Sequence, residues 1–324
     1  MTSAAASRPL TERSGIFGGL SQWLYVMPHP APAIEIGPSH VAAAKWQDAR
    51  LQSYAVEPLE AGAVMPSPVE TNVTQPDGVR HALQRVLARV GDLAGPVALL
   101  LPDPVVRVFI LPFEDLPRSA DEALPLLRWR LKKSVPFDVE ETVVSWSRQT
   151  ARQGAMEVVA AVARQGIVRE YEGLLEGFGI QPTVVLSSTL ATLPLVGEAG
   201  STLLMRMSGR TLTTAIVRGP TLCLYRSTEM PAPAAQLDPK WLLEEIFPAT
   251  AYYQDTWGGL IDRALLAGFQ GRKDVFQVAV ENELKMTARA LSAGDVAATL
   301  DRSALDLMQA GLDPLVGWMA NAGA

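Results

Sequence analysis

The chain has 324 residues, of which 48% are hydrophobic, so it is long enough to form a large core and more than one folding unit. Its formal net charge of −6 leaves no broad basic field that could hold nucleic acid. One cysteine and three scattered histidines exclude a disulfide framework and a zinc site with the usual ligand spacing, and they favour a reducing compartment.

Residues 15–27 place their apolar side chains on one helical face after Arg8 and Arg13. No stretch of the sequence reaches the roughly 18 apolar residues that a membrane-spanning helix needs. We therefore expect this segment to lie on a membrane surface or to dock on a partner. A secretory signal is disfavoured because Ser21 and Gln22 interrupt the apolar run and because cleavage would leave the first strand as a bare terminus.

A strand–turn–strand hairpin is predicted over residues 33–46. The lone acid Glu35 lies between two isoleucines, and Gly37, Pro38 and Ser39 supply the turn before a second apolar run. An acid, a glycine and small polar residues between two strands have the form of a hairpin that binds phosphate. An ordinary hairpin accounts for the same residues, so the motif alone leaves both interpretations open.

A second hairpin of the same form is predicted over residues 203–214, and its partner strand over residues 221–227 follows a Gly219-Pro220 turn. One such hairpin in each half of the chain indicates a duplicated α/β fold. The two halves would then form two lobes with a cleft between them.

The remaining elements follow from the spacing of apolar residues. Asp77 and Asp238 have the context of helix N-caps, and Gly91 that of a helix end. The other predicted strands are residues 51–59, 96–101, 105–111, 142–148, 156–163, 182–186, 263–267 and 285–290. The predicted helices are residues 78–90, 119–134, 167–178, 188–196, 240–257, 274–282 and a tail that runs to residue 318.

The helix at residues 119–134 has the most detailed signature. It opens with Ser119-Ala120-Asp121-Glu122, a capping box in which the first and last side chains would satisfy backbone N–H groups. Basic residues fill its second half, where they favour the helix dipole. We interpret them as a solvated face rather than an anion site: Arg128, Arg130, Lys132 and Lys133.

With these motifs in place, the sequence resembles the PilM family of type IV pilus assembly proteins, which belongs to the actin-like ATPase superfamily and is related to FtsA and to the cytoplasmic part of GspL. The resemblance runs from about Ile34 to Trp318. The stretches that carry it are Ser119-Ala120-Asp121-Glu122, Leu127-Arg128-Trp129, Val135-Pro136-Phe137, Val143-Val144-Ser145-Trp146, residues 54–59, residues 251–254 and residues 261–268.

The resemblance implies an α/β actin-like ATPase fold: two lobes of duplicated βββαβ topology, with an FtsA-type 1C subdomain inserted in the first lobe. The implied domain division has six parts. These are an N-terminal segment at 1–32, a first lobe at 33–111, the 1C subdomain at 112–186, a linking helix at 187–200, a second lobe at 201–300, and a C-terminal helical segment at 301–324 that packs on the first lobe.

The two hairpins depart from the family pattern at the positions that would carry chemistry. Glu35 stands for the first acid, but Ala42 replaces the usual lysine. In the second hairpin Arg206 stands where an acid helps to place Mg²⁺, so the metal role is lost, although an arginine could itself neutralise a phosphate. The resemblance assigns a degenerate nucleotide cleft to Glu35, Gly37, Pro38, Ser39, Arg206, Ser208, Gly209 and Gly268.

By the same resemblance we expect a non-catalytic scaffold, cytoplasmic and peripheral to the inner membrane, in the assembly platform of type IV pili or of a related type II secretion system. Its implied partner is the cytoplasmic tail of a PilN-like membrane protein, beside other platform proteins and further copies of the chain. The predicted partner groove consists of Leu127, Trp129, Val135, Pro136 and Phe137.

Membrane contact would be indirect or through residues 15–27, and no metal site or catalytic residue is expected. ATP is the cofactor that the cleft would take, with turnover lost and binding left open. The alternatives are an active actin-like ATPase and a filament-forming protein like FtsA.

Overall fold

The computed structural model describes residues 31–47, 50–93, 95–150, 154–198, 200–269, 271–292 and 302–321. The segment at 15–27 lies outside the described residues. Within them, no helix is long and apolar enough to cross a bilayer.

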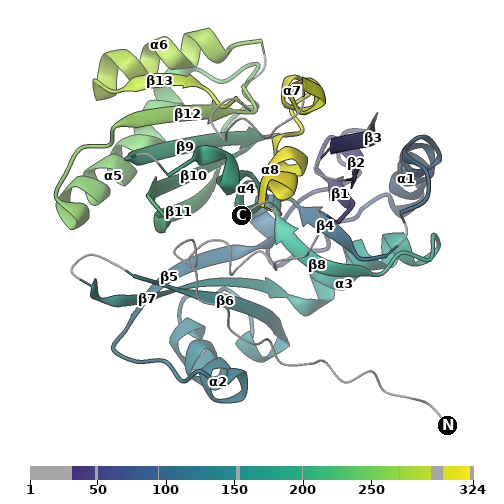
Figure 1. Ribbon diagram of the computed structural model, residues 1–324, viewed down its shortest axis with the longest axis horizontal. Helices are drawn as coiled ribbons and strands as arrows, with labels where there is room; N and C mark the ends of the chain where they lie inside the picture. Colours follow the sequence, from purple (N-terminus) through teal and green to yellow (C-terminus); the bar gives the residue numbers. More distant parts are fainter. Residues whose placement is uncertain are drawn as a thin grey trace.

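Three β-sheets organise the described part of the chain (Figure 1). The first has five strands in the order β3-β2-β1-β4-β8, and the second has five in the order β11-β10-β9-β12-β13. The first sheet consists of β1 (Ala33–Ile36), β2 (His40–Gln47), β3 (Arg50–Pro58), β4 (Val97–Leu101) and β8 (Pro182–Ser187). The second consists of β9 (Ser201–Ser208), β10 (Thr211–Arg218), β11 (Thr221–Glu229), β12 (Arg263–Ala267) and β13 (Thr287–Ala290).

The two five-stranded sheets repeat one pattern of pairing. In each, an antiparallel hairpin and a third antiparallel strand are followed by two parallel strands. Glu35 of β1 pairs with Ala42, and Arg206 of β9 pairs with Thr213, so the acid and the arginine occupy the same place in the two repeats. The predicted duplication is therefore confirmed, and with it the correspondence between the two hairpins.

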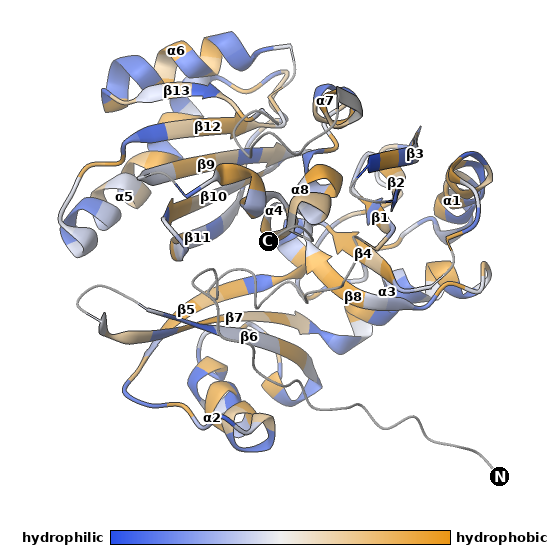
Figure 2. Ribbon diagram, viewed as in Figure 1, coloured by the Kyte–Doolittle hydropathy of each residue, from blue (hydrophilic) through white to orange (hydrophobic). Residues whose placement is uncertain are grey.

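The helices cover the sheets in separate layers (Figure 1). Helices α1 (Pro76–Val90) and α3 (Gln165–Glu176) share a core with the first sheet, and α5 (Pro239–Trp257) and α6 (Lys273–Leu284) share one with the second. Figure 2 shows β4 and β8 almost wholly hydrophobic, whereas α1 and α6 alternate between hydrophobic and hydrophilic sides. This is the pattern of buried parallel strands beneath amphipathic helices.

A pair of helices joins the two lobes. Helix α4 (Ser188–Thr192), continued by η4 (Leu193–Val196), packs against the C-terminal α8 (Asp313–Asn321), and α7 (Arg302–Gln309) precedes it. Leu204 of β9 and Leu265 of β12 belong to the same apolar cluster as these helices. The residues directly before and after each of them belong instead to the cluster that contains α5 and α6. Alternation along the strand thus turns every second residue of β9, Arg206 included, toward the first lobe.

A third, smaller sheet has the order β5-β7-β6, and its strand β5 contacts β11 of the second sheet. Its strands are β5 (Arg107–Phe113), β6 (Thr142–Thr150) and β7 (Met156–Arg164), with η2 (Val139–Glu141) before β6. Helix α2 (Ala120–Leu131) packs on it through a separate core.

Two stretches belong to sheets other than those expected. β5, expected in the first lobe up to residue 111, pairs with β7 in the third sheet, whereas β8, expected in the inserted subdomain, pairs with β4 in the first. Helix α3 likewise joins the core of the first lobe. An apolar run shows that a strand is buried but does not show which strand lies beside it, so these boundaries could not be read from the pattern.

The caps also differ in detail. Helix α1 begins at Pro76 with Gln75 as its N-cap, and Asp77 lies in the first turn, where it pairs with Arg80. Ser119 is the N-cap of α2, but its side chain accepts no cap hydrogen bond, so the predicted capping box is wrong in that respect. Asp238 caps α5 as predicted and accepts from the backbone N of Lys240 at 2.9 Å.

The contact between α4 and α8 gives a stability test. A Cβ placed on Gly317 would overlap the carbonyl oxygen of Ala191, whereas a Cβ on Gly173 of α3 would meet nothing within 4 Å. We expect Gly317→Ala to lower the free energy of unfolding by about 1 to 3 kcal/mol through overpacking. Gly173→Ala should leave it unchanged or raise it by about 0.5 to 1 kcal/mol, because alanine favours a helix. Urea denaturation of both variants measures this, and equal stabilities would contradict the packing described.

Candidate functional site

The structure brings the predicted cleft residues together where the two hairpin turns meet. A Cβ on Gly209 would lie 3.2 Å from Cγ of Pro38, so the turn of the second hairpin lies against the turn of the first. Gly268, at the end of β12, lies against the backbone of Met207, one residue before Ser208. A side chain at Gly268 would overlap the backbone of Met207, one at Gly209 would press on the Pro38 ring, and both glycines have positive φ.

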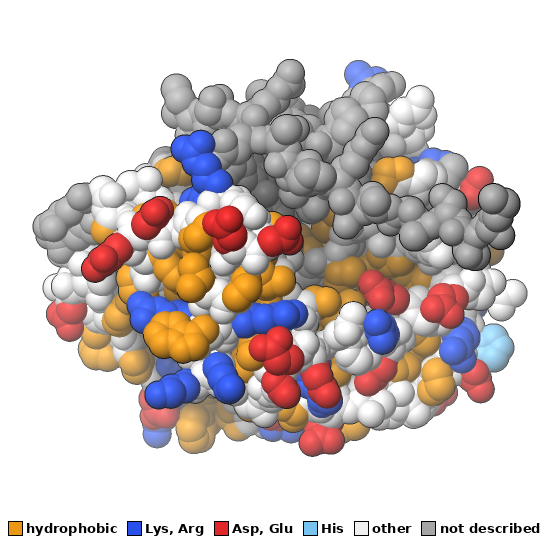
Figure 3. Space-filling model, turned by 90° about the horizontal axis from the view of Figure 1, so that it is seen from below, with side chains coloured by type: hydrophobic (Ala, Val, Ile, Leu, Met, Phe, Trp, Pro, Cys, Tyr) orange, Lys and Arg blue, Asp and Glu red, His pale blue; other side chains and the backbone are white. Residues whose placement is uncertain are grey.

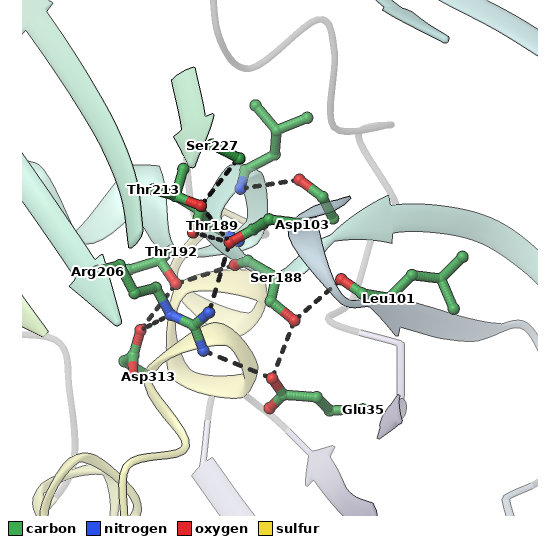
Figure 4. A network of polar contacts seen from close by, with 12 residues as sticks. Glu35, Leu101, Asp103, Ser188, Thr189, Thr192, Arg206, Thr213, Ser227 and Asp313 are labelled. Carbon is green, nitrogen blue, oxygen red and sulfur yellow. Dashed lines mark hydrogen bonds and ion pairs between the residues drawn. The ribbon is translucent and has the colours of Figure 1, made fainter. Parts of the chain in front are cut away.

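Arg206 lies at the centre of this region, with only 3% of its surface exposed (Figure 4). Its Nε donates to Oδ2 of Asp313 at 2.7 Å, its Nη2 lies 3.5 Å from Oε1 of Glu35, and its Nη1 lies 3.7 Å from Oδ2 of Asp103. We call Arg206, Glu35, Asp103 and Asp313 the Arg206 cluster. Among the described residues it joins β9 of the second lobe to β1, η1 (Asp103–Val105) and α8.

Asp103 receives most of the hydrogen bonds in the cluster. Its Oδ1 accepts from the backbone N of Thr189 at 2.8 Å and from the Tyr225 hydroxyl at 3.2 Å. Its Oδ2 accepts from the hydroxyls of Thr189 at 2.5 Å and Thr213 at 2.8 Å. Because α4, β10 and β11 each supply a donor, this carboxylate links both lobes.

Hydroxyls of α4 donate to the other two carboxylates, while the buried Oε2 of Glu35 and Nη1 of Arg206 have no hydrogen-bond partner among the described residues. Ser188 donates to Oε1 of Glu35 at 2.9 Å and Thr192 donates to Oδ2 of Asp313 at 2.9 Å. Buried charges remain stable only when hydrogen bonds and opposite charges replace their lost hydration. The small hydroxyl side chains of α4 therefore supply one hydrogen bond to each of the three acids, which is part of the compensation that burial requires.

Glu35 and Arg206 each stabilise the charged form of the other. Burial alone would raise the pKa of Glu35, but its interactions with His40, Arg206 and Ser188 outweigh burial and hold the pKa below its usual value. Burial would lower the pKa of Arg206, but the carboxylates, Asp313 first, hold it above its usual value. The acid and the arginine therefore form an ion pair.

His40 adds a further group at the edge of the cluster. Its Nε2 lies 3.8 Å from Oε2 of Glu35, which is within ion-pair range but too long for a hydrogen bond. On its other side, Nδ1 lies 3.4 Å from the Ser39 hydroxyl. The first turn thus contributes Ser39 and His40 to the wall around Glu35.

This arrangement binds the lobes to each other. The guanidinium, which could have neutralised a phosphate, already faces carboxylates on all three of its nitrogens. Within the described ranges, no group of three or more His, Cys, Asp or Glu side chains is placed to hold a metal ion.

The predicted groove residues lie on different sides of α2. Leu127 is fully buried in the core of the third sheet, while Trp129, two residues on, is 72% exposed. Residues two apart on a helix face opposite sides, so Leu127 and Trp129 do not line one surface. Beyond the helix, Val135 and Phe137 pack against that core and Pro136 is exposed.

Sequence reasoning missed two of the acids, Asp103 and Asp313. A signal was present for each: Asp103 follows a wholly apolar strand, and Asp313-Pro314 has the form of a helix start, like Asp238-Pro239. The hydroxyl cluster at residues 187–189 also stands between a strand and a helix. The contacts of Asp103 and Asp313 with Arg206 depend on tertiary structure, which local sequence patterns do not encode.

Comparison with known proteins supports the fold. No family model matches the sequence, and no curated protein matches it either. Among solved structures, a chain of the PilM–PilN type IV pilus biogenesis complex superposes with a TM-score of 0.73 at 17% identity, covering 91% of this chain and 98% of that one. The two chains share one fold. The predicted α/β fold of two duplicated lobes is confirmed by this likeness together with the duplicated sheet topology.

Two further structures are more distant. The cytoplasmic domain of EpsL, an inner-membrane component of the type II secretion system of Vibrio cholerae, has a TM-score of 0.45 at 12% identity and covers 72% of this chain and 80% of that one. A protein with an actin-like ATPase fold from Bacteroides thetaiotaomicron has a TM-score of 0.46 at 11% identity, covering 80% and 89%. We draw no conclusion from either.

The Arg206 cluster predicts a large effect of one substitution. Arg206→Ala leaves three buried carboxylates without their cation, and breaking a buried ion pair in this way costs about 3 to 5 kcal/mol of unfolding free energy. Arg210→Ala is the matched control, because Arg210 is exposed and its pair with Glu229 contributes little. Chemical denaturation compares the two variants. Equal stabilities would show that the cluster does not hold the lobes together.

Proposed function

We propose that this protein is a non-catalytic scaffold of an inner-membrane assembly platform for type IV pili or for a related type II secretion system. The observation that carries the proposal is a likeness in fold to a chain of the PilM–PilN complex, combined with a buried arginine in place of the second hairpin's acid. The scaffold is cytoplasmic and peripheral to the membrane.

The proposed loss of catalysis rests on charge. Phosphoryl transfer depends on positioning and on stabilisation of developing charge by a metal ion and cationic groups. Here Arg206 is neutralised by carboxylates, Glu35 is committed to Arg206 and Ser188, and Ala42 offers no cation beside Glu35. The nucleotide site is therefore degenerate, and the interlobe ion pair occupies the region where phosphates would bind.

The proposed partner is the short cytoplasmic tail of a PilN-like, single-span membrane protein. The candidate groove lies beside the third sheet, where Val135, Pro136 and Phe137 lead from α2 toward β6. Val135 and Phe137 are half-buried against the core of the third sheet and Pro136 is exposed, so these side chains give a peptide an apolar anchor without unfolding the core. Other platform proteins and further copies of the chain are additional partners in this proposal.

The alternatives fit the structure less well. An active ATPase needs an acid at the position of Arg206. A membrane-attached filament protein like FtsA would contact lipid through an exposed amphipathic helix, and α8 is not such a helix. Trp318 and Met319 of α8 are instead buried, and the Trp318 indole N–H donates to the carbonyl of Ala31 at 2.9 Å.

Isothermal calorimetry with a synthetic tail peptide tests the proposal. The peptide is the cytoplasmic N-terminal segment of the PilN-like protein from the same organism, and a scrambled peptide is the control. We expect a dissociation constant of about 1 to 10 µM for the native tail, since short ordered peptides bind with about −7 to −8 kcal/mol. Phe137→Ala should weaken binding about tenfold, whereas Trp241→Ala on the second lobe should not. Equal heats from native and scrambled peptides would refute the partner.

A further inference from the structure

Helix α2 packs one side against the core and exposes two large apolar side chains on the other. Ala123, Leu127 and Leu131 pack without exposure against the third sheet. The opposite side carries Leu126, which is 43% exposed, and Trp129, which is 72% exposed. These two residues are three apart and therefore neighbours on one helical face.

Cations lie at the C-terminal end of this face, and the exposed acids Asp121 and Glu122 lie in the first turn of the helix. Arg130, Lys132 and Lys133 are exposed at the C-terminal end of α2, and we call Leu126, Trp129, Arg130, Lys132 and Lys133 the α2 surface. Figure 3 looks at the molecule from below, toward the side where Figure 1 places α2, and shows Lys and Arg side chains gathered around hydrophobic ones.

The charges of the α2 surface are mostly free. Arg130 donates to the carbonyl of Pro112 at 3.2 Å and its guanidinium lies 5.8 Å from the ring centre of Phe113, so no carboxylate neutralises it. The ion pair that Arg128 forms with Glu140 at 3.2 Å lies outside this surface. In the portion of the chain that the structure describes, Lys132 and Lys133 have no carboxylate within 4.0 Å.

The second lobe offers a comparison. Trp241 of α5 is 48% exposed. Lys240, beside it, forms an ion pair with Glu244 at 3.6 Å. Glu245 of the same helix pairs at 3.0 Å with Arg226 of β11. The cations near Trp241 are therefore paired with carboxylates. Of these two exposed tryptophans, Trp129 on the α2 surface is the one that lies beside unpaired cations.

We propose that the α2 surface rests on the anionic headgroups of a phospholipid bilayer. An indole ring prefers the interface between water and hydrocarbon, and cations beside it attract anionic lipid within a Debye length. The surface is a convex helix face with one large ring at its centre, which suits shallow contact with a broad plane. Since the whole chain carries a net charge of −6, attraction to such a plane has to come from a local cluster like this one.

The contact uses other side chains than the proposed tail-binding groove, which begins two residues after Lys133, and it needs no nucleotide. It would orient the scaffold with its third sheet toward the membrane. A weak lipid contact and a weak tail contact acting together bind far more tightly than either does alone, because the second contact is intramolecular.

Vesicle sedimentation of the full-length protein tests the proposal. We expect it to bind phosphatidylcholine vesicles that contain phosphatidylglycerol, to bind pure phosphatidylcholine vesicles much less, and to be released by salt. Trp129→Ala and the double variant Lys132→Glu/Lys133→Glu should each lower the partition coefficient about tenfold or more. Trp241→Ala, the matched control for an exposed tryptophan, should leave it unchanged.

All of the substituted side chains are exposed, so the variants should fold, and circular dichroism checks this. Any contribution of residues 15–27 is the same in every variant, so differences between variants report the α2 surface alone. Absence of wild-type binding to the anionic vesicles would overturn the proposal. Equal binding by the wild type and the α2 variants would overturn it as well.

Discussion

The buried guanidinium of Arg206 is the group on which the arrangement of the two lobes depends. It is contributed by the second lobe and surrounded by Glu35, Asp103 and Asp313. An arginine without solvent is costly unless opposite charges and hydrogen bonds compensate it, and here each carboxylate also accepts from a hydroxyl of α4. If the lobes separated, every one of these groups would lose partners at once. The cluster therefore favours one relative position of the lobes.

The duplication explains why the two hairpins face each other. Glu35 and Arg206 stand at equivalent places in two copies of one strand pattern, and the two turns touch at Pro38 and Gly209. In a site that binds nucleotide between the hairpins, two acids at these places would repel each other unless a cation lay between them. An arginine in one copy supplies that positive charge from the protein itself. The geometry of the fold is kept, and the ion pair between Glu35 and Arg206 bridges the two hairpins.

Local chemistry was enough to predict much of this. Alternation around Glu35 and around Arg206 gave both hairpins, and Asp238-Pro239 marked the start of α5. What could not be predicted was pairing at a distance. Nothing in the sequence of β5 or β8 indicates which sheet each joins. For the same reason Asp103 and Asp313, which are 103 and 107 residues from Arg206, were invisible as its partners. The orientation of Leu127 and Trp129 could not be predicted for a different reason. A motif shared with a family identifies the residues but does not show that one side chain is buried and the other exposed.

The central claim is that the Arg206 cluster, and not a nucleotide, holds the lobes together. The most direct measurement is the thermal unfolding midpoint of the full-length protein with and without millimolar ATP and Mg²⁺. A ligand that binds the native state raises the midpoint in proportion to the logarithm of its concentration above the dissociation constant. The account predicts no shift. A concentration-dependent rise of about 3 °C or more, as a stabilisation of about 1 kcal/mol would give, would contradict it.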